Sequence, residues 1–169
     1  GAADGAALPD AIRRWYAAHA GDRLVGRAKY TTPVDINWDD QTYRGDAYAA
    51  YAWAAHVAEV EVDLRTYIVR VTDYVAVQEI GKVVNPTLER GQIQGGVAQG
   101  IGWALFEEVV LQDGAMQNCQ MTNYTIPTAC DLPPIRVYFA ELPTRYGPQG
   151  AKGIGELPMD GPAPAVVNA

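Results

Sequence analysis

The spacing of apolar and polar positions changes along the chain, and each change predicts a different element. Apolar residues recur every three or four positions between residues 9 and 20, which predicts an amphipathic helix. Residues 24–32 are rich in strand-favouring side chains and predict a strand, whereas the polar, turn-forming segment 33–46 predicts a loop. Two aromatic side chains of that loop, Trp38 and Tyr43, are expected to pin it to the body of the domain.

From residue 47 to residue 74 the pattern becomes an alternation of period two. The alternation breaks near Asp63-Leu64, so we predict two strands joined by a turn there, most simply an antiparallel hairpin. The first strand carries a row of acidic side chains at alternate positions, Glu59, Glu61 and Asp63. Alternate carboxylates on a strand point the same way without converging, so a solvated sheet face is expected rather than a metal site.

A long helix is predicted to begin at Asn85-Pro86, a capping residue followed by the residue favoured at the first helical position, and to run to about residue 111. Its apolar residues at intervals of four predict one buried ridge: Ile93, Val97, Ile101 and Leu105.

Glycine is unusually frequent in this predicted helix, although each one costs about 1 kcal/mol relative to alanine. Five occur there: Gly91, Gly95, Gly96, Gly100 and Gly102. They either allow another helix to pack closely or allow a ligand to approach the backbone. The glutamines among them favour the second interpretation, because they offer neutral donors and acceptors: Gln92, Gln94 and Gln99.

The rest of the chain predicts a turn at Asp113-Gly114, strands over residues 118–126 and 135–142, and a helix from residue 162 to residue 169. Together the elements predict an α+β fold, with a mixed, largely antiparallel sheet and helices packed on it.

Composition narrows the class of protein. The chain has 169 residues, enough for one domain with its own core, and its net charge of −7 leaves no excess of cations for phosphates, so no nucleic-acid partner is expected. No apolar run reaches the roughly 20 residues of a membrane helix, and the first residues lack the order of a secretion signal. We therefore expect no membrane span and a cytoplasmic location. Cys119 and Cys130 are expected to be reduced and buried, and His19 and His56 share no metal-ligand spacing.

The strongest candidate for chemistry is the glycine-rich segment 147–158. Such backbone can turn sharply and direct N–H groups at an anion or an oxo group, with Lys152 as a charge beside it. Glu156, at the rim, has the carboxylate needed for a general base. The alternative is a long surface turn with a solvated glutamate. The sequence contains no phosphate-loop, dinucleotide-fingerprint or nucleophile-elbow motif.

Five short motifs follow one another in a fixed order: Asn85-Pro86, the glycine- and glutamine-rich residues 91–102, Tyr124-Thr125-Ile126-Pro127-Thr128, Asp131-Leu132-Pro133, and residues 150–156. In this order they resemble the C-terminal part of the molybdopterin-binding large subunit of the xanthine dehydrogenase and aldehyde oxidoreductase family. The resemblance runs from about residue 51 to residue 169 and is weaker before it.

Enzymes of that family hydroxylate an aldehyde or an electron-poor carbon of an N-heterocycle, with water as the oxygen source. The resemblance implies that Glu156 is the catalytic residue, a general base that deprotonates the molybdenum-bound hydroxyl. It also implies a molybdopterin cofactor, with or without a cytosine dinucleotide tail, and no direct metal ligand from this chain. The cofactor-binding residues that it implies are Gln99, Gly95, Gly96, Gly100, Lys152, Gly153 and Gly155.

The family's subunit is several times longer, so the resemblance implies that residues 1–169 are a single domain or a fragment of it. Residues 1–46 are expected to be peripheral and residues 47–169 to form the motif-bearing core. The implied partners are the remaining part of the molybdopterin subunit, iron–sulfur and flavin (FAD) groups on other chains or domains, and a small-molecule substrate; the isolated chain is expected to be inactive. The alternatives are a non-catalytic interaction domain or isolated fragment that keeps the fold without cofactor, and a stand-alone binder of small anions.

Two positions depart from the family pattern. Thr66-Tyr67 stands where the family usually has Thr-Gly, and Glu79 stands where it usually has Asp shortly before Asn-Pro. Both lie in the predicted hairpin region, so they are expected to affect strand geometry more than the site.

Overall fold

The computed structural model describes residues 7–31 and 33–169. The chain divides into two compact units, Gly1–Thr32 and Pro33–Ala169. The second unit carries the sheet and all five motifs. The division into a peripheral part up to residue 46 and a motif-bearing core from residue 47 stays a prediction.

The first unit contains one helix, α1 (Leu8–Ala18), among its described residues, and this confirms the helix predicted there. Trp15 stacks on His19 one turn later, with ring centroids 4.5 Å apart. The strand predicted over residues 24–32 is wrong for residues 24–31, which are not in a strand, and Thr32 lies outside the described residues. A strand is stable only when a neighbour takes its hydrogen bonds, and within the described chain no strand pairs with this segment.

The predicted loop over residues 33–46 is a loop that contains a very short hairpin, β1 (Trp38–Asp39) paired with β2 (Arg44–Gly45). The expectation that Trp38 and Tyr43 pin it to the body is wrong. Their exposed rings meet each other edge-on, with centroids 5.9 Å apart, because the tight turn brings them together. The Thr42 hydroxyl, with the amides of residues 41 and 42, bonds the Asp39 carboxylate and lowers its pKa.

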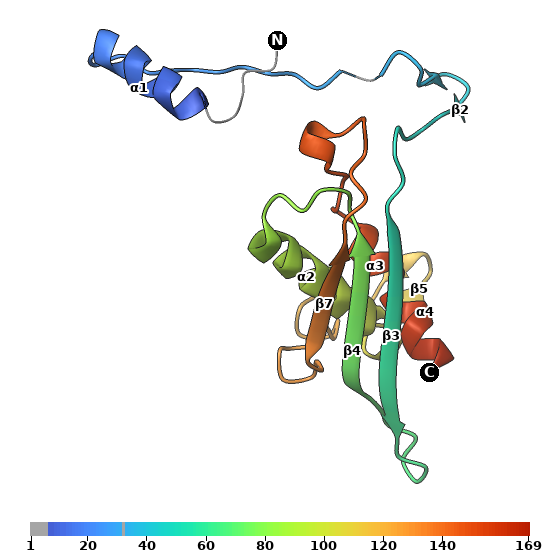
Figure 1. Ribbon diagram of the computed structural model, residues 1–169. Coiled ribbons are helices and arrows are strands. Elements are labelled where there is room, and N and C mark those ends of the chain that lie inside the picture. The colour runs from blue at the N-terminus through green and yellow to red at the C-terminus, as the bar shows by residue number, and fades with distance from the viewer. Residues whose placement is uncertain (1–6, 32) are drawn as a thin grey trace. The chain divides into compact units, whose positions relative to one another are not determined.

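The main sheet has three strands in the order β3-β4-β7. Strands β3 (Trp53–Val62) and β4 (Val69–Glu79) form the predicted antiparallel hairpin, and β7 (Ile135–Ala140) lies parallel to β4 on its other side. Figure 1 shows these three strands side by side with α2 (Pro86–Leu105) crossing behind them. The predicted α+β class with a mixed sheet is confirmed.

The turn between β3 and β4 explains one departure from the family pattern. Tyr67 has φ of 58°, in the left-handed region that favours glycine, and its amide donates to the carbonyl oxygen of Asp63 at 2.6 Å. A side chain in this conformation costs roughly 1–2 kcal/mol. The hairpin still pairs from Val62–Val69 onward, with one register shift between Glu59 and Val60. The acidic row of Glu59, Glu61 and Asp63 is exposed as predicted.

Helix α2 confirms the predicted cap and the predicted ridge. The Asn85 side chain accepts a hydrogen bond from the Leu88 amide at 3.1 Å. Three ridge residues are fully buried and the last is partly buried: Ile93, Val97, Ile101 and Leu105. They pack in one core with residues of β4, β7 and the C-terminal helix: Val71, Tyr74, Ala76, Val137 and Val166.

The helix ends at Leu105 rather than near residue 111, so that boundary was wrong. The amides of Phe106 and Glu107 both donate to the Gly102 carbonyl oxygen at 2.9 Å, which closes the last turn. Beyond it, the Asn118 side-chain oxygen accepts a hydrogen bond from the Val110 amide at 2.9 Å, and its side-chain NH₂ group donates to the Glu108 carbonyl oxygen at 2.6 Å. These side-chain bonds compete with helical ones and lead into the short hairpin of β5 (Leu111–Gln112) and β6 (Ala115–Met116), whose turn is the predicted Asp113-Gly114.

The strand predicted over residues 118–126 is also wrong, because this segment consists of turns and irregular backbone. Asparagine side chains close its turns locally: the Gln120 amide donates to Asn123 at 3.0 Å. Cys119 and Cys130 are free, as expected, but both are exposed rather than buried.

The chain finishes with two short helices, α3 (Leu157–Asp160) and α4 (Pro162–Asn168), and the second confirms the helix predicted from residue 162. Helix α2 packs against both, α4 also lies on β3, and Figure 1 shows α4 behind that strand. Among the described residues, every helix is too short or too polar to cross a membrane.

Candidate active site

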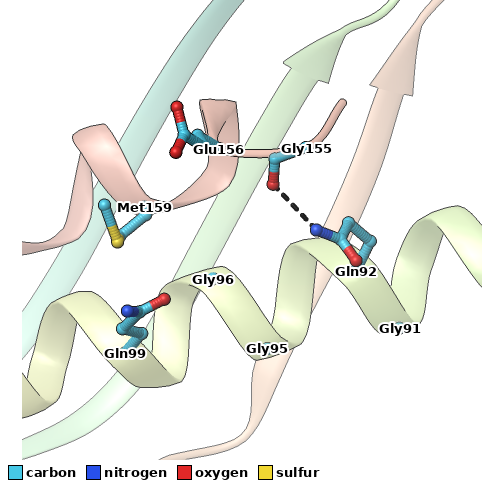
Figure 2. Close-up of a pocket in the computed structure, with 8 residues that line it drawn as sticks. All are labelled: Gly91, Gln92, Gly95, Gly96, Gln99, Gly155, Glu156 and Met159. Carbon is cyan, nitrogen blue, oxygen red and sulfur yellow. Dashed lines mark hydrogen bonds between the residues drawn. The ribbon is translucent and has the colours of Figure 1, made fainter. Parts of the chain in front are cut away.

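A pocket of about 270 Å³ lies between α2 and the segment that leads into α3 (Figure 2). Its lining comes from two parts of the chain that are remote in sequence. Helix α2 contributes Gly91, Gln92, Gly95, Gly96 and Gln99, and the C-terminal segment contributes Gly155, Glu156 and Met159.

Helical periodicity explains why these residues share one side of α2. Positions 91, 95 and 99 are four residues apart, and positions 92 and 96 lie beside them, so all five project from one face. The buried ridge of Ile93, Val97 and Ile101 occupies the opposite face and holds the helix on the sheet. One helix thus serves the core on one side and the pocket on the other.

The glycines of α2 fall into two groups, one with open backbone and one packed against another helix. A side-chain carbon added at Gly91 or Gly95 would meet nothing within 4 Å, so the backbone there is open toward the pocket. A carbon added at Gly96 would lie 2.6 Å from Pro158, and one added at Gly100 would lie 2.7 Å from Pro162. These two glycines therefore allow α3 and α4 to pack closely on α2.

Glu156 stands where the pocket meets α3. Its side chain is exposed, and within the described chain its carboxylate has no hydrogen-bond partner. The preceding residue is fixed from α2, because the Gln92 side chain donates to the Gly155 carbonyl oxygen at 2.7 Å (Figure 2). On the other side, the Met159 amide donates to the Glu156 carbonyl oxygen at 2.9 Å.

The far end of α3 rests on a buried polar cluster. A side-chain carbon at Gly161 would lie 2.1 Å from the His56 ring. His56 contacts the Tyr74 hydroxyl at 2.8 Å and the Gln78 amide at 3.0 Å. Burial lowers the pKa of His56 and so favours the neutral ring in this contact. The negative charge of Asp160 partly opposes this shift.

The structure brings five of the predicted site residues together: Gln99, Gly95, Gly96, Gly155 and Glu156. Three others do not line this pocket. Gly100 packs on Pro162, and a side-chain carbon at Gly153 would meet nothing within 4 Å. The Lys152 ammonium donates to Glu79 at 2.5 Å and to the Tyr51 carbonyl oxygen at 2.8 Å.

Sequence reasoning did not assign Met159 to the site. It named Gly91 and Gln92 among the glycines and glutamines that favour a ligand near this helix, but not among the cofactor-binding residues that the resemblance implies. It also expected the departure at Glu79 to affect strand geometry more than the site. The Glu79 carboxylate is instead buried against Lys152 of the glycine-rich segment 147–158, which we call the site loop.

The residues that line the pocket fit a molybdopterin cofactor. A flat ring can lie against the bare helix backbone at Gly91 and Gly95. The pterin ring also has a polar edge of donors and acceptors, which suits the Gln99 amide, a group with no partner within the described residues. Over residues 7–31 and 33–169, no cluster of three His, Cys, Asp or Glu side chains could hold a metal ion.

Residues 4–133 match the molybdopterin cofactor-binding domain family, and the chain belongs to that family. The xanthine dehydrogenase molybdenum-binding subunit of Escherichia coli O157:H7 is 34% identical over 120 residues, which are 70% of this chain and 16% of that protein. Quinoline 2-oxidoreductase from Pseudomonas putida 86 is 45% identical, with a TM-score of 0.64 over 68% of this chain and 15% of that one. The aldehyde oxidoreductase from Desulfovibrio desulfuricans ATCC 27774 is 34% identical, with a TM-score of 0.71 over 80% of this chain and 15% of that one.

The predicted family is therefore confirmed, and its members named here are molybdenum-dependent oxidoreductases. The family model matches from residue 4, so it includes the region before residue 51 where the predicted resemblance was weaker, and it ends before the loop of Glu156. The chain spans about 16% of the length of the relatives that it matches.

Proposed function

We propose that this chain forms part of a molybdenum hydroxylase that oxidises an aldehyde or an N-heterocycle, with water as the oxygen source and Glu156 as the general base. The observation that carries the proposal is the unpartnered Glu156 carboxylate beside a pocket whose other wall is glycine backbone and glutamine amides. A carboxylate with no competing hydrogen bond can accept a proton and later release it.

Separate residues of the chain would bind the cofactor and transfer the proton. Gln99 would bond the polar edge of the pterin, Gly95 would let it lie against the helix, and Gly155 would let the loop pass close to it. Gly96, Gly100 and Gly153 remain predicted contacts. The cofactor, when bound, supplies the redox centre that accepts the electron pair and activates oxygen from water. Glu156 holds the proton at a carboxylate oxygen, and the Gln92–Gly155 hydrogen bond holds that carboxylate at the rim.

The substrate class follows the relatives: one is named for xanthine, one for quinoline and one for aldehydes. The same proposal includes the partners: the remaining part of the large subunit, and iron–sulfur and FAD groups on other chains or domains, which carry electrons away. A cytosine dinucleotide tail on the pterin and a cytoplasmic location belong to the proposal too.

The replacement Gly95→Val in the complete large subunit tests whether this pocket holds the cofactor. The first side-chain carbon of the valine would meet no protein atom within 4 Å, and the side chain would stand in the space that the pocket leaves for a ligand. We expect molybdenum and pterin content, measured by mass spectrometry of the metal and fluorescence of the oxidised pterin, to fall at least about tenfold, the scale of a lost 1.4 kcal/mol of binding.

The matched control is Thr87→Val, on the exposed first turn of the same helix and outside the pocket lining. It is expected to keep full cofactor content. Full content in Gly95→Val as well would contradict the assignment of this pocket.

A further inference from the structure

We infer that Lys152 and Glu79 act as one positioning unit for Glu156, a role for this lysine other than contact with the cofactor. The inference rests on the proposed function for its meaning in catalysis, but its structural part stands on the contacts of the pair alone.

The pair is an isolated, buried ion pair. Lys152 Nζ lies 2.5 Å from Glu79 Oε2, and the two side chains are only 12% and 7% exposed. The same ammonium donates to the Tyr51 carbonyl oxygen at 2.8 Å, just before β3 begins. Two of the three N–H donors of the lysine thus have acceptors within the protein, and the lysine does not line the pocket.

The carboxylate of the pair is bound from its other side as well. Its second oxygen accepts the Gly81 amide at 2.8 Å. Burial by itself raises the pKa of Glu79, but the hydrogen bond and charge of Lys152, with amide bonds from Gly81 and Leu142, outweigh it and lower the pKa. Glu79 is thus held as an anion by three separate parts of the chain.

Backbone hydrogen bonds beside the ion pair also hold the site loop to the end of β4, and we call the pair and these bonds together the clamp. The Lys152 amide donates to the Ile80 carbonyl oxygen at 2.8 Å, and the Lys82 amide donates to the Gly150 carbonyl oxygen at 2.9 Å. Gly81 has φ of 71°, and a side-chain carbon there would lie 2.3 Å from the Gly150 carbonyl oxygen. The loop is therefore held against the end of β4 only four residues before Glu156.

A buried ion pair adds little net stability, because desolvation of two charges offsets their attraction. It does fix geometry, since removal of one partner leaves a buried charge that must find a new position. A displacement of about 1 Å at a catalytic group can lower a rate about 100-fold. The clamp therefore determines where the Glu156 carboxylate stands.

The test uses the complete enzyme with Lys152→Met, Glu79→Gln and the double variant. Both single changes are expected to lower kcat by about 10- to 100-fold, with KM and molybdenum content within about twofold of the parent enzyme. The double variant, which buries no unpaired charge and so folds readily, is expected to be no slower than the worse single variant, because the two residues act as a unit.

Hydrogen exchange gives a readout that does not depend on activity. The amides of Lys152 and Lys82, which donate between the loop and the end of β4, are expected to exchange at least about tenfold faster in Lys152→Met, because the loop loses its anchor. The matched control is Glu141→Gln, which breaks the neighbouring exposed ion pair between Glu141 and Lys82, 3.3 Å apart, at a side chain that is 44% exposed. This control is expected to change neither exchange nor kcat.

Each contrary result has a clear meaning. Loss of molybdenum in Lys152→Met with unchanged loop exchange would overturn the inference in favour of direct cofactor contact. An effect of Lys152→Met without any effect of Glu79→Gln would overturn the idea of a unit. Faster exchange in an enzyme whose activity is indifferent to Glu156 would keep the clamp and remove the proposed function, so the two failures are distinguishable.

Discussion

Replacement of Glu156 by glutamine is expected to abolish turnover in the complete enzyme while leaving its molybdenum and pterin content intact. Glutamine keeps the size of the side chain and its capacity to accept hydrogen bonds, but it cannot take up a proton near neutral pH. Loss of a positioned general base lowers kcat by roughly 10²–10⁴-fold. Steady-state kinetics with an aldehyde and an N-heterocycle, on enzyme of measured molybdenum content, would show the effect.

Glu108→Gln is the matched control for this change, because Glu108 is also exposed but lies outside the pocket lining. It is expected to leave kcat and cofactor content unchanged. Normal turnover in Glu156→Gln would remove the base assignment. Loss of cofactor in Glu156→Gln would instead assign the carboxylate to binding.

The adjacent glycines Gly95 and Gly96 provide the second large expected effect. Propensity alone predicts that alanine at either position stabilises the helix by about 1 kcal/mol. At Gly96, however, the new carbon would lie 2.6 Å from the Pro158 side chain and 3.1 Å from its backbone. Pro158 is fully buried and cannot move aside, so Gly96→Ala is expected to lower the free energy of unfolding by about 1–3 kcal/mol.

The same change should reach the site, because Pro158 lies two residues after Glu156 on α3. Gly96→Ala is therefore expected to lower kcat as well as the melting temperature of the complete subunit. Gly95→Ala is the internal control, with an equal or higher melting temperature, because its new carbon would meet nothing within 4 Å. Equal melting temperatures for the two variants would contradict the packing of α3 on α2 described above.

Long periodic patterns in this sequence predicted structure well. The four-residue ridge of α2 and the alternation of β3 and β4 each extend over many residues and agree with their burial. They succeed because the same periodicity that places apolar groups on one face also fixes which face meets the core.

Short patterns failed where structure depends on a partner elsewhere in the chain. Residues 24–31 have strand-favouring side chains, but no neighbouring strand pairs with them within the described residues. Residues 118–126 alternate as a strand would, yet asparagine side chains bond the backbone and close turns instead.

Part of the candidate site was predicted from local motifs, and the part that depends on a distant partner in the chain was not. The motif series identified Gln99, Gly95 and Glu156, and the structure brings them to one pocket. The partner of Lys152 was not predictable, since Glu79 lies 73 positions earlier and looks like one more strand residue. Ion pairs between distant positions leave no local signal, so the clamp on the site loop emerged only from the folded chain.

The molybdenum content of the protein purified from its native host, with every co-purifying polypeptide identified, decides whether this chain works in a molybdenum hydroxylase. The proposed function predicts molybdenum in equimolar amount, together with the rest of a large subunit, either within one polypeptide or as a complex. A complete assembly that carries this sequence but contains neither molybdenum nor pterin would contradict it, and would leave a domain that keeps the fold for binding other proteins.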